Sequence, residues 1–393
     1  MLINYVGAFR LPNLDAAAPR VINNAKALRK AGCEVIFISW GGTYRKEDLC
    51  MDGKYRVCGF EYVISGDLPI GGSIWDRFST RLHRGRRSIN LMKSLPRPDL
   101  IITYNASNAF TKIMIRYCKA KDIKLANDVS EWYSNDELHF IDVLSNYINM
   151  VHTQRLVKNK IVISSFLDSY YSDSNNVLVP PLCDQDEPKW TTFVDDERIK
   201  PFKGVTLIYA GNPAKKDCIH SVIRAVNTLA NEGKLIRFLI LGISREDYMR
   251  RHNSSLIGGT SIHDNVLFLG RVSQDLIPAY YRKADFMVLL REPNRKSMAG
   301  FPTKFAESMT AGIPVITNAT SDLPKYVING KTGFLSIGFD YDSVLYTLRK
   351  SVLPLSSNEI CEMKENVKMS RSAFDWNSHV NDFKVFIKSL RSL

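Results

Sequence analysis

Short apolar runs alternate with longer amphipathic stretches along most of the 393-residue chain. Leu2–Val6 and Glu34–Ser39 are apolar runs of strand length, and Ala16–Ala31 between them repeats apolar residues at helical spacing. Strands that are buried on both faces read as continuous Val, Ile and Leu runs, and their alternation with helices favours a parallel sheet. The further strands expected in this half are Leu100–Thr103, Lys124–Asn127, Ile161–Ser164 and Val177–Val179.

The alternation breaks at Pro180 and Pro181 and then begins again. Residues 184–192 are polar and rich in turn formers, which is typical of a linker. We therefore predict an α/β fold of two Rossmann-like domains, at residues 1–183 and 184–372, with an interdomain cleft. The second domain is expected to contain strands at Thr206–Ala210, Arg237–Gly242, Val266–Gly270, Phe286–Leu290 and Pro314–Thr317, and helices at His220–Asn231, Ser273–Ala284 and Thr303–Ala311.

Residues 373–393 differ from both halves because they form a single amphipathic stretch. A lone helix of this kind needs an apolar surface on which to lie. It could cap the second domain or cross back to the first, and we predict a crossover helix that packs on the N-terminal domain. The apolar residues at helical spacing are Val380, Phe383, Phe386, Ile387 and Leu390.

Residues 299–317 hold the most informative motif of the chain. Gly300 allows close backbone approach, a helix start is expected at Thr303, and Lys304 and Glu307 are neighbours on one helical face. A helix start presents free N–H groups and partial positive charge, so a diphosphate there would also meet Lys304. Glu307 could accept hydrogen bonds from a ribose diol. The alternative is a solvated Lys304–Glu307 pair, worth only about 0.3 kcal/mol.

This motif resembles the donor-binding segment of retaining GT-B glycosyltransferases of the family-four type. It has the Gly-Phe-Pro-x-Lys-x-x-Glu form often found in bacterial surface-polysaccharide enzymes. Glu307 matches the second glutamate of the family's Glu-x7-Glu pattern, whereas Ala299 stands at the first. The resemblance implies catalytic roles for Lys304 and Glu307. We expect further contacts to the donor from Arg291, Gly300, Phe301, Pro302 and Thr303.

Residues 209–217 read Tyr-Ala-Gly-Asn-Pro-Ala-Lys-Lys-Asp and resemble the first loop of the family's C-terminal domain. In that loop a glycine precedes a basic residue for the pyrophosphate. The resemblance implies a catalytic role for Lys216 and donor contacts from Gly211, Asn212 and Lys215. Two exposed lysines on a turn are the alternative interpretation.

Residues 7–20 of the first domain are expected to form a loop that enters a helix. They resemble the family's N-terminal loop, where small residues let the donor phosphate and the acceptor approach the backbone. Asp15 and Arg20 are the candidate acceptor-binding residues of this segment. Arg20 exposed on the helix surface is the alternative.

Residues 127–133 follow a predicted strand, at the carboxyl edge where open α/β sheets bind ligands. Carboxylates accept hydrogen bonds from sugar hydroxyls, and aromatic rings cover the apolar faces of sugars. We therefore take Asp128 as a catalytic candidate and Glu131 and Trp132 as acceptor-binding candidates. Ordinary capping of the loop by Asp128 is the alternative.

Histidines and cysteines form no pattern that indicates a metal or a nucleophile. The seven histidines are isolated, and the seven cysteines are scattered without a Cys-x-x-Cys, which favours reduced thiols. We expect no metal and no cofactor besides a nucleotide-sugar co-substrate. Basic residues and a helix start would then neutralise a leaving diphosphate. The chain shows neither a signal peptide nor an apolar run of about 18 residues, so we expect a cytoplasmic protein.

The chain carries 53 Lys and Arg against 40 Asp and Glu, a formal net charge of +13. Residues 77–97 contain Lys and Arg but no acid. Trp75, Phe78, Leu82, Ile89 and Met92 lie near one helical stripe of residues 75–97. This pattern predicts a helix on an anionic membrane surface at the cytoplasmic face, and a basic helix packed on the sheet is the alternative. No zinc-finger, KH or RNP pattern supports nucleic acid as a partner.

The resemblance implies a glycosyltransferase that moves a sugar from a nucleotide-sugar donor to a glycan or lipid-pyrophosphate acceptor. Capsule, O-antigen or exopolysaccharide biosynthesis is the expected context. A sugar-nucleotide epimerase of the same fold is an alternative enzyme, and it would convert its donor with no acceptor present. A basic module that binds nucleotide sugars or nucleic acid without catalysis is the non-enzymatic alternative.

Overall fold

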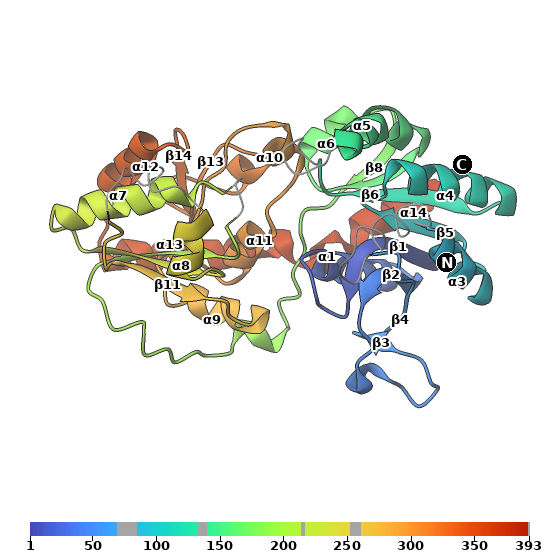
Figure 1. Ribbon diagram of the computed structural model, residues 1–393, viewed down its shortest axis with the longest axis horizontal. Helices are drawn as coiled ribbons and strands as arrows, with labels where there is room; N and C mark the ends of the chain where they lie inside the picture. The colour runs from blue at the N-terminus through green and yellow to red at the C-terminus, as the bar shows by residue number, and fades with distance from the viewer. Residues whose placement is uncertain (69–84, 133–139, 214–216, 252–260, 392–393) are drawn as a thin grey trace. The chain divides into compact units, whose positions relative to one another are not determined.

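The computed structural model describes residues 1–68, 85–132, 140–213, 217–251 and 261–391. The chain divides into two compact α/β units, each built on a mainly parallel sheet (Figure 1). The first unit comprises Met1–Cys183, Ala299–Phe301 and Trp376–Leu393, and the second comprises Asp184–Met298 and Pro302–Asp375. The α/β fold class expected from the alternation of strands and helices is confirmed.

The described residues of the first unit form a sheet in the order β3-β4-β2-β1-β5-β6-β7-β8. All neighbouring pairs are parallel except β3 with β4. The strands are β1 (Leu2–Leu11), β2 (Glu34–Gly42), β3 (Arg56–Val57), β4 (Phe60–Ile64), β5 (Leu100–Tyr104), β6 (Lys124–Val129), β7 (Asn159–Val162) and β8 (Asn175–Leu178). The helices are α1 (Ala17–Lys30), α3 (Arg86–Ser94), α4 (Asn108–Lys121), α5 (Phe140–Ile148), α6 (Ser165–Tyr170) and α14 (Val380–Arg391).

The first strand is longer than the apolar run predicts, and this corrects the expected loop at residues 7–20. After a register shift, β1 continues to Leu11, which pairs with Gly42 at the end of β2. Gly42 has a φ of +130°, and a Cβ added there would lie 2.1 Å from the Leu11 carbonyl oxygen. Because only glycine permits this approach, the strand extends, and the loop shrinks to the residues just before α1.

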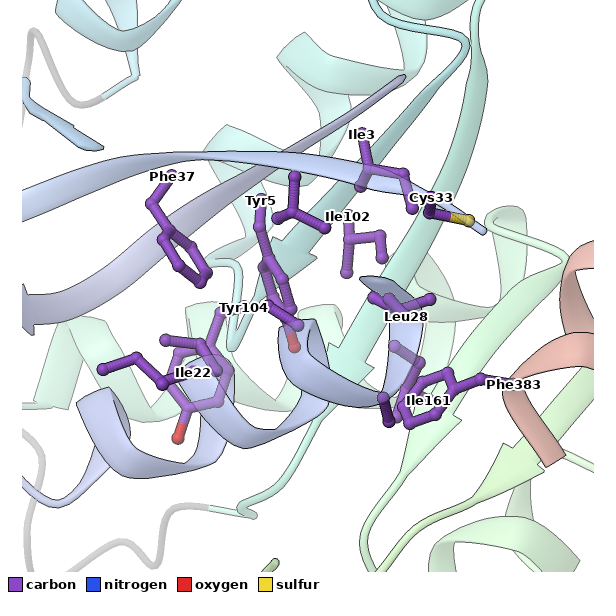
Figure 2. Close-up of a cluster of buried hydrophobic side chains, with 14 of the residues drawn as sticks. Ile3, Tyr5, Ile22, Leu28, Cys33, Phe37, Ile102, Tyr104, Ile161 and Phe383 are labelled. Carbon is purple, nitrogen blue, oxygen red and sulfur yellow. The ribbon is translucent and has the colours of Figure 1, made fainter. Parts of the chain in front are cut away.

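Apolar side chains cover both faces of the first sheet. One cluster lies between the sheet and α1 and includes Tyr5, Leu28 and Ile161 (Figure 2). Phe383 of α14 joins this cluster together with Val380, Phe386, Ile387 and Leu390 of the same helix. The aromatic C-terminal helix therefore completes the core of the first unit.

The described residues of the second unit form a parallel sheet in the order β11-β10-β9-β12-β13-β14. Its strands are β9 (Val205–Ala210), β10 (Ile236–Leu241), β11 (Val266–Gly270), β12 (Phe286–Leu289), β13 (Val315–Asn318) and β14 (Gly333–Ser336). The helices of this part of the chain are α7 (Ile219–Asn231), α8 (Arg245–Arg251), α9 (Ile277–Tyr281), α10 (Arg295–Ala299), α11 (Thr303–Thr310), α12 (Tyr341–Thr347) and α13 (Ser357–Ser370).

The helix expected over residues 273–284 is much shorter. A 3-10 turn at Gln274–Leu276 precedes α9, which begins at Ile277 with Pro278 in its first turn. Proline has no N–H to donate to an earlier carbonyl, and its ring suits only the first turn of an α-helix. The helix therefore begins at Ile277, directly before the proline, rather than at residue 273.

Candidate functional site

The carboxyl edge of the second sheet brings together polar side chains from distant parts of the sequence. β9 lies beside β12, and β12 lies beside β13. Tyr209 is near the end of β9, Arg291 follows β12, and Asn318 ends β13. Asp217 forms an isolated β-bridge with Arg291, which brings the loop after β9 to the same edge. Ligands of open α/β sheets bind at this edge.

Four of these groups form one hydrogen-bonded set, the Asp217 cluster, made of Tyr209, Asp217, Arg291 and Lys304. Arg291 Nε lies 2.9 Å from Asp217 Oδ1, and Lys304 Nζ lies 2.8 Å from Oδ2. The Tyr209 hydroxyl donates to Asp217 Oδ2 over 2.6 Å and accepts from Lys304 Nζ over 2.5 Å. One carboxylate thus holds two cations, and the four groups carry a formal charge of +1.

Lys304 and Arg291 differ in their exposure to solvent. Together their charges determine the ionisation of the Asp217 carboxylate. The exposed fraction is 2% for the Asp217 side chain, 8% for Arg291 and 20% for Lys304. Burial alone would raise the pKa of Asp217, but the charges of Lys304 and Arg291 outweigh it and hold that pKa well below its usual value. Asp217 is therefore ionised at neutral pH, and the excess positive charge is at Lys304, the most exposed of the three.

Gly211 explains how Lys304 reaches Asp217. Its φ is +129°, and a Cβ added there would lie 2.5 Å from Cε of Lys304. The lysine side chain therefore passes over the bare backbone of the glycine. Gly211 serves the cluster by leaving room for Lys304, in addition to any backbone approach by a ligand.

Helix α11 carries Lys304 and Glu307 close to its start. Pro302 precedes the helix, and no side chain caps its first N–H groups. Glu307 is half-buried, and burial raises its pKa, whereas Lys189 and Lys304 lower it. Among the described residues the Glu307 carboxylate accepts no hydrogen bond. A half-buried acceptor without a donor fits a ligand that brings hydroxyl groups.

The remaining donor candidates are not gathered in the Asp217 cluster. The Asn212 side chain is exposed and accepts a hydrogen bond from Arg251 of α8 over 2.9 Å. Gly300 and Phe301 group with the first unit, whereas Pro302 and Thr303 belong to the second. Lys215 and Lys216 lie outside the residues that the structure describes.

In the first unit the structure joins Arg20 of α1 to Asp128 of β6. Arg20 Nη2 lies 2.7 Å from Asp128 Oδ1, and the two side chains are 2% and 0% exposed. The Tyr5 hydroxyl and the Asn24 amide also donate to Asp128. Arg20 donates further to the Val179 carbonyl over 3.2 Å. We call these four side chains, of Tyr5, Arg20, Asn24 and Asp128, the Asp128 cluster.

This geometry corrects the expected roles of Arg20 and Asp128. The strand β6 continues two residues beyond its predicted end, and this places Asp128 inside the sheet rather than in a loop. A fully enclosed carboxylate cannot touch a substrate while its hydrogen bonds last. We therefore assign the pair a structural role, in which Arg20 fixes the chain where it leaves the first unit.

The other acceptor candidates are spread over the first unit. Asp15 accepts hydrogen bonds from the N–H groups of Ala17 and Ala18 and so caps α1. Trp132 is 6% exposed, and its ring packs edge-on against Tyr170. Glu131 is exposed to solvent. The assignment of an acceptor to Glu131 and Trp132 stays a prediction.

The basic segment is described only from residue 85 onward, so Trp75 and Phe78 lie outside the described part. In α3, Met92 is buried and Ile89 packs against the core of the first unit. These two apolar side chains therefore contact the protein. The expectation that they face a membrane surface is wrong, and the alternative of a basic helix packed on its own unit applies to them. Arg86 and Lys93 are exposed. Within the described chain, no helix has both the length and the apolar character needed to cross a bilayer.

Metal ligands do not gather in the part of the chain that can be described. There, no group of three or more His, Cys, Asp or Glu side chains is placed to hold an ion. Independence from metal ions stays a prediction.

The motif at residues 209–217 predicts no role for Tyr209 and Asp217, two members of the Asp217 cluster. Tyr209 offers a signal, because a phenol near the end of a buried strand needs a hydrogen-bond partner. Nothing in the spacing of Asp217 indicates that Lys304, 87 positions away, would be its partner.

Two successive α/β units, each built on a mainly parallel sheet, are the architecture of the GT-B class of folds. Sucrose-phosphate synthase from Thermosynechococcus elongatus has this fold, with a TM-score of 0.75 and 16% identity over 100% of this chain and 99% of that one. HepE of Anabaena, solved in complex with UDP-glucose, has a TM-score of 0.68 and 14% identity over the whole of both chains.

Residues 194–352 match the family of glycosyl transferases group 1. The chain is also 28% identical over 146 residues to WcaL of Salmonella typhimurium, a protein named for glycosyl transfer in colanic acid biosynthesis. That match covers 37% of this chain and 35% of the relative, so the chain spans about a third of the length of the curated relatives it matches. The chain therefore has the GT-B fold, and its second unit contains a segment similar to the glycosyl transferases of group 1.

Proposed function

We propose that this protein transfers a sugar from a nucleotide-sugar donor to a glycan or lipid-pyrophosphate acceptor in surface polysaccharide biosynthesis. The donor binds the second unit and the acceptor binds the first. The Asp217 cluster carries this proposal, because it combines an excess cation, a ligand-binding sheet edge and a lysine at the start of α11, where Pro302 provides no side-chain cap.

The chemistry follows from the charge that develops on the leaving group. As the bond between the sugar and the diphosphate breaks, negative charge grows on the phosphate oxygens. Lys304 and the N–H groups at the start of α11 stabilise this charge, and Arg291 supports it from behind. These groups supply the positive charge that a divalent cation would otherwise bring. The transfer is therefore proposed to be independent of metal ions, and retention of configuration is proposed from the family resemblance.

Glu307 is proposed to bind the ribose of the donor. Its carboxylate is half-buried one helical turn from Lys304 and accepts no hydrogen bond from the described residues. A ribose diol would supply two donors there. HepE was solved with UDP-glucose, and this makes a UDP-sugar the first donor to test.

The substitution Glu307→Gln tests the ribose assignment. Hydrogen bonds to a charged group contribute about 1.5–3 kcal/mol, so the affinity for UDP should fall by about tenfold or more. Affinity for inorganic pyrophosphate, which has no ribose, should stay unchanged. Glu365→Gln, at an exposed position on α13, is the matched control. Equal affinity of Glu307→Gln and Glu365→Gln for UDP would refute the assignment of Glu307 to the ribose.

The acceptor-free reaction separates a transferase from an epimerase. We expect purified protein with a donor alone to leave the sugar nucleotide unconverted, apart from slow hydrolysis. Isomerisation without an acceptor would contradict the proposal. A thermal-shift screen of sugar nucleotides identifies the donor, because a ligand that binds the folded state raises its apparent stability.

The exposed basic side chains of α3 are proposed to contact an anionic membrane surface. Arg86 and Lys93 face solvent, while the apolar side of the helix packs on its own unit. The contact would then be electrostatic, with no insertion by this helix, and it would weaken with salt.

A further inference from the structure

Arg291 and Lys304 both form an ion pair with Asp217, but they differ in burial and in the number of contacts that fix their backbone. Arg291 Nε is 2.9 Å from Asp217, and the backbone of Arg291 is fixed as well. Its N–H donates to Asn318 Oδ1 over 2.9 Å, and its carbonyl accepts from Asn318 Nδ2 over 2.7 Å. The side chain of Arg291 is almost fully buried. Its guanidinium is fixed by Asp217 and its backbone is fixed by Asn318.

Lys304 is the more exposed of the two cations. Its side chain is 20% exposed, and its Cε rests against the backbone of Gly211, where no side chain blocks it. The four-carbon stem of a lysine carries a compact charge that reorients easily, unlike the planar fork of an arginine. The ammonium can therefore leave Asp217 without disturbing Arg291.

We propose that Asp217 is a resident counter-ion of the donor site, from which the diphosphate takes over Lys304. In the free protein Asp217 keeps two neighbouring cations from repelling each other. When a diphosphate binds, the Lys304 ammonium turns from Asp217 to a phosphate oxygen, while Arg291 stays with Asp217. This inference rests on the proposed donor site of the second unit.

The exchange has a consequence for affinity. Since Asp217 competes with the diphosphate for Lys304 and also repels it, the carboxylate weakens binding of the anion. A weaker hold on the diphosphate helps the product leave after transfer. The low pKa of Asp217 agrees with this role, because the carboxylate stays charged at neutral pH.

A crystal structure of the unmodified protein with inorganic pyrophosphate tests the exchange directly. We expect Lys304 Nζ to hydrogen-bond a phosphate oxygen and to lie beyond 4 Å, roughly the limit of an ion pair, from Asp217. Arg291 should keep its bond to Asp217. Pyrophosphate bound at this edge with Lys304 still on Asp217 would overturn the inference but leave the proposed function standing. If neither pyrophosphate nor UDP binds, both are wrong.

The substitution Asp217→Asn tests the competition in solution. The variant should bind pyrophosphate about three- to tenfold more tightly, because a nearby negative charge is removed. In a Lys304→Gln background the gain should be clearly smaller, because the competition for the lysine is absent and only the direct repulsion by Asp217 is left to remove. In transfer assays the single variant should lower the donor KM without raising kcat.

A purely structural role for Asp217 predicts the opposite result. The loss of a framework carboxylate would then weaken pyrophosphate binding in both backgrounds. Weaker binding by a folded Asp217→Asn variant, or a gain that is equally large with Lys304→Gln, would overturn the inference. If the variant does not fold, the structure of the unmodified protein with pyrophosphate still decides.

Discussion

The Asp128 cluster of the first unit and the Asp217 cluster of the second are built from similar groups for different purposes. Each joins a tyrosine from a central strand, a buried aspartate and an arginine. In the first unit, Arg20 balances Asp128, and both side chains are closed to solvent. In the second unit, Arg291 already balances Asp217, and Lys304 adds a second, partly exposed cation.

The difference shows how one set of residues serves either structure or binding. A balanced pair that is fully enclosed has no charge to offer a ligand, and its role is to fix the chain. An unbalanced set with an exposed cation attracts an anion, and its place at the carboxyl edge of the sheet gives that anion access. Excess charge and exposure separate the two clusters, whereas residue type does not.

The largest expected effect is on the stability of the first unit. Asp128→Asn leaves Arg20 buried without its counter-ion, and breaking such a pair costs about 3–5 kcal/mol. Hydrogen exchange of β6 and α1 measures the loss, and pyrophosphate binding by the folded fraction should not change. Asp173→Asn removes an exposed carboxylate and serves as the control. Unchanged stability with a selective loss of transfer would instead make Asp128 catalytic.

The next largest effect is on pyrophosphate affinity, when the space that Gly211 leaves for the Lys304 side chain is filled. In Gly211→Ala the new Cβ would meet Cε of Lys304, so the lysine must move, and pyrophosphate affinity should fall about tenfold. Gly233 also has a positive φ, but nothing lies within 4 Å of a Cβ added there. Titration calorimetry of Gly233→Ala should therefore show normal affinity. Equal losses in both variants would mean that backbone strain, not Lys304, explains the result.

The two acids of the second unit should respond to pH in opposite directions. The pKa of Asp217 is lowered by folding, so its contribution to stability is present above the unfolded value of 3.8 and disappears as the pH falls further. The pKa of Glu307 is raised, so its contribution is lost as the pH rises above 4.5. Unfolding of Glu307→Gln across this range should show a gain over the unmodified protein that grows with pH. A gain independent of pH would contradict the assignment.

The smallest expected effect is on membrane binding. Each cation near an anionic surface contributes about 1 kcal/mol, so Arg86→Glu with Lys93→Glu should reduce pelleting with anionic vesicles at low salt. Lys283→Glu with Lys350→Glu changes the net charge equally, at exposed positions of the second unit. Equal pelleting by the two double variants would show that α3 is not a specific contact.

The sequence predicts the architecture well because hydrophobic periodicity is a local property, and its alternation between strands and helices favours a parallel sheet. The strands β9 and β11 and the helices α1 and α11 lie within one residue of their expected ends. Prediction fails where an element end depends on a distant contact, as at Leu11 beside Gly42, or on a single proline, as at Pro278.

The candidate site is less predictable than the fold for a physical reason. A motif states which residues follow one another, but burial and ion pairing depend on residues that fold beside them. Lys304 and Glu307 could be chosen from a helix start. The partnership of Lys304 with Asp217 arises only in the folded chain, where α11 packs beside β13. The sequence pattern predicts Asp128 in a loop after the strand. In the structure β6 continues two residues further, and the Asp128 side chain is buried.

The central claim is that the Asp217 cluster binds the diphosphate of a nucleotide sugar through Lys304. Calorimetric titration of UDP and UMP into the unmodified protein and into Lys304→Gln tests it most directly, with Lys368→Gln on α13 as the control. We expect UDP to bind more tightly than UMP. We also expect Lys304→Gln, but not Lys368→Gln, to lose about tenfold or more of the affinity for UDP. Equal affinity of Lys304→Gln and the unmodified protein for UDP would contradict it.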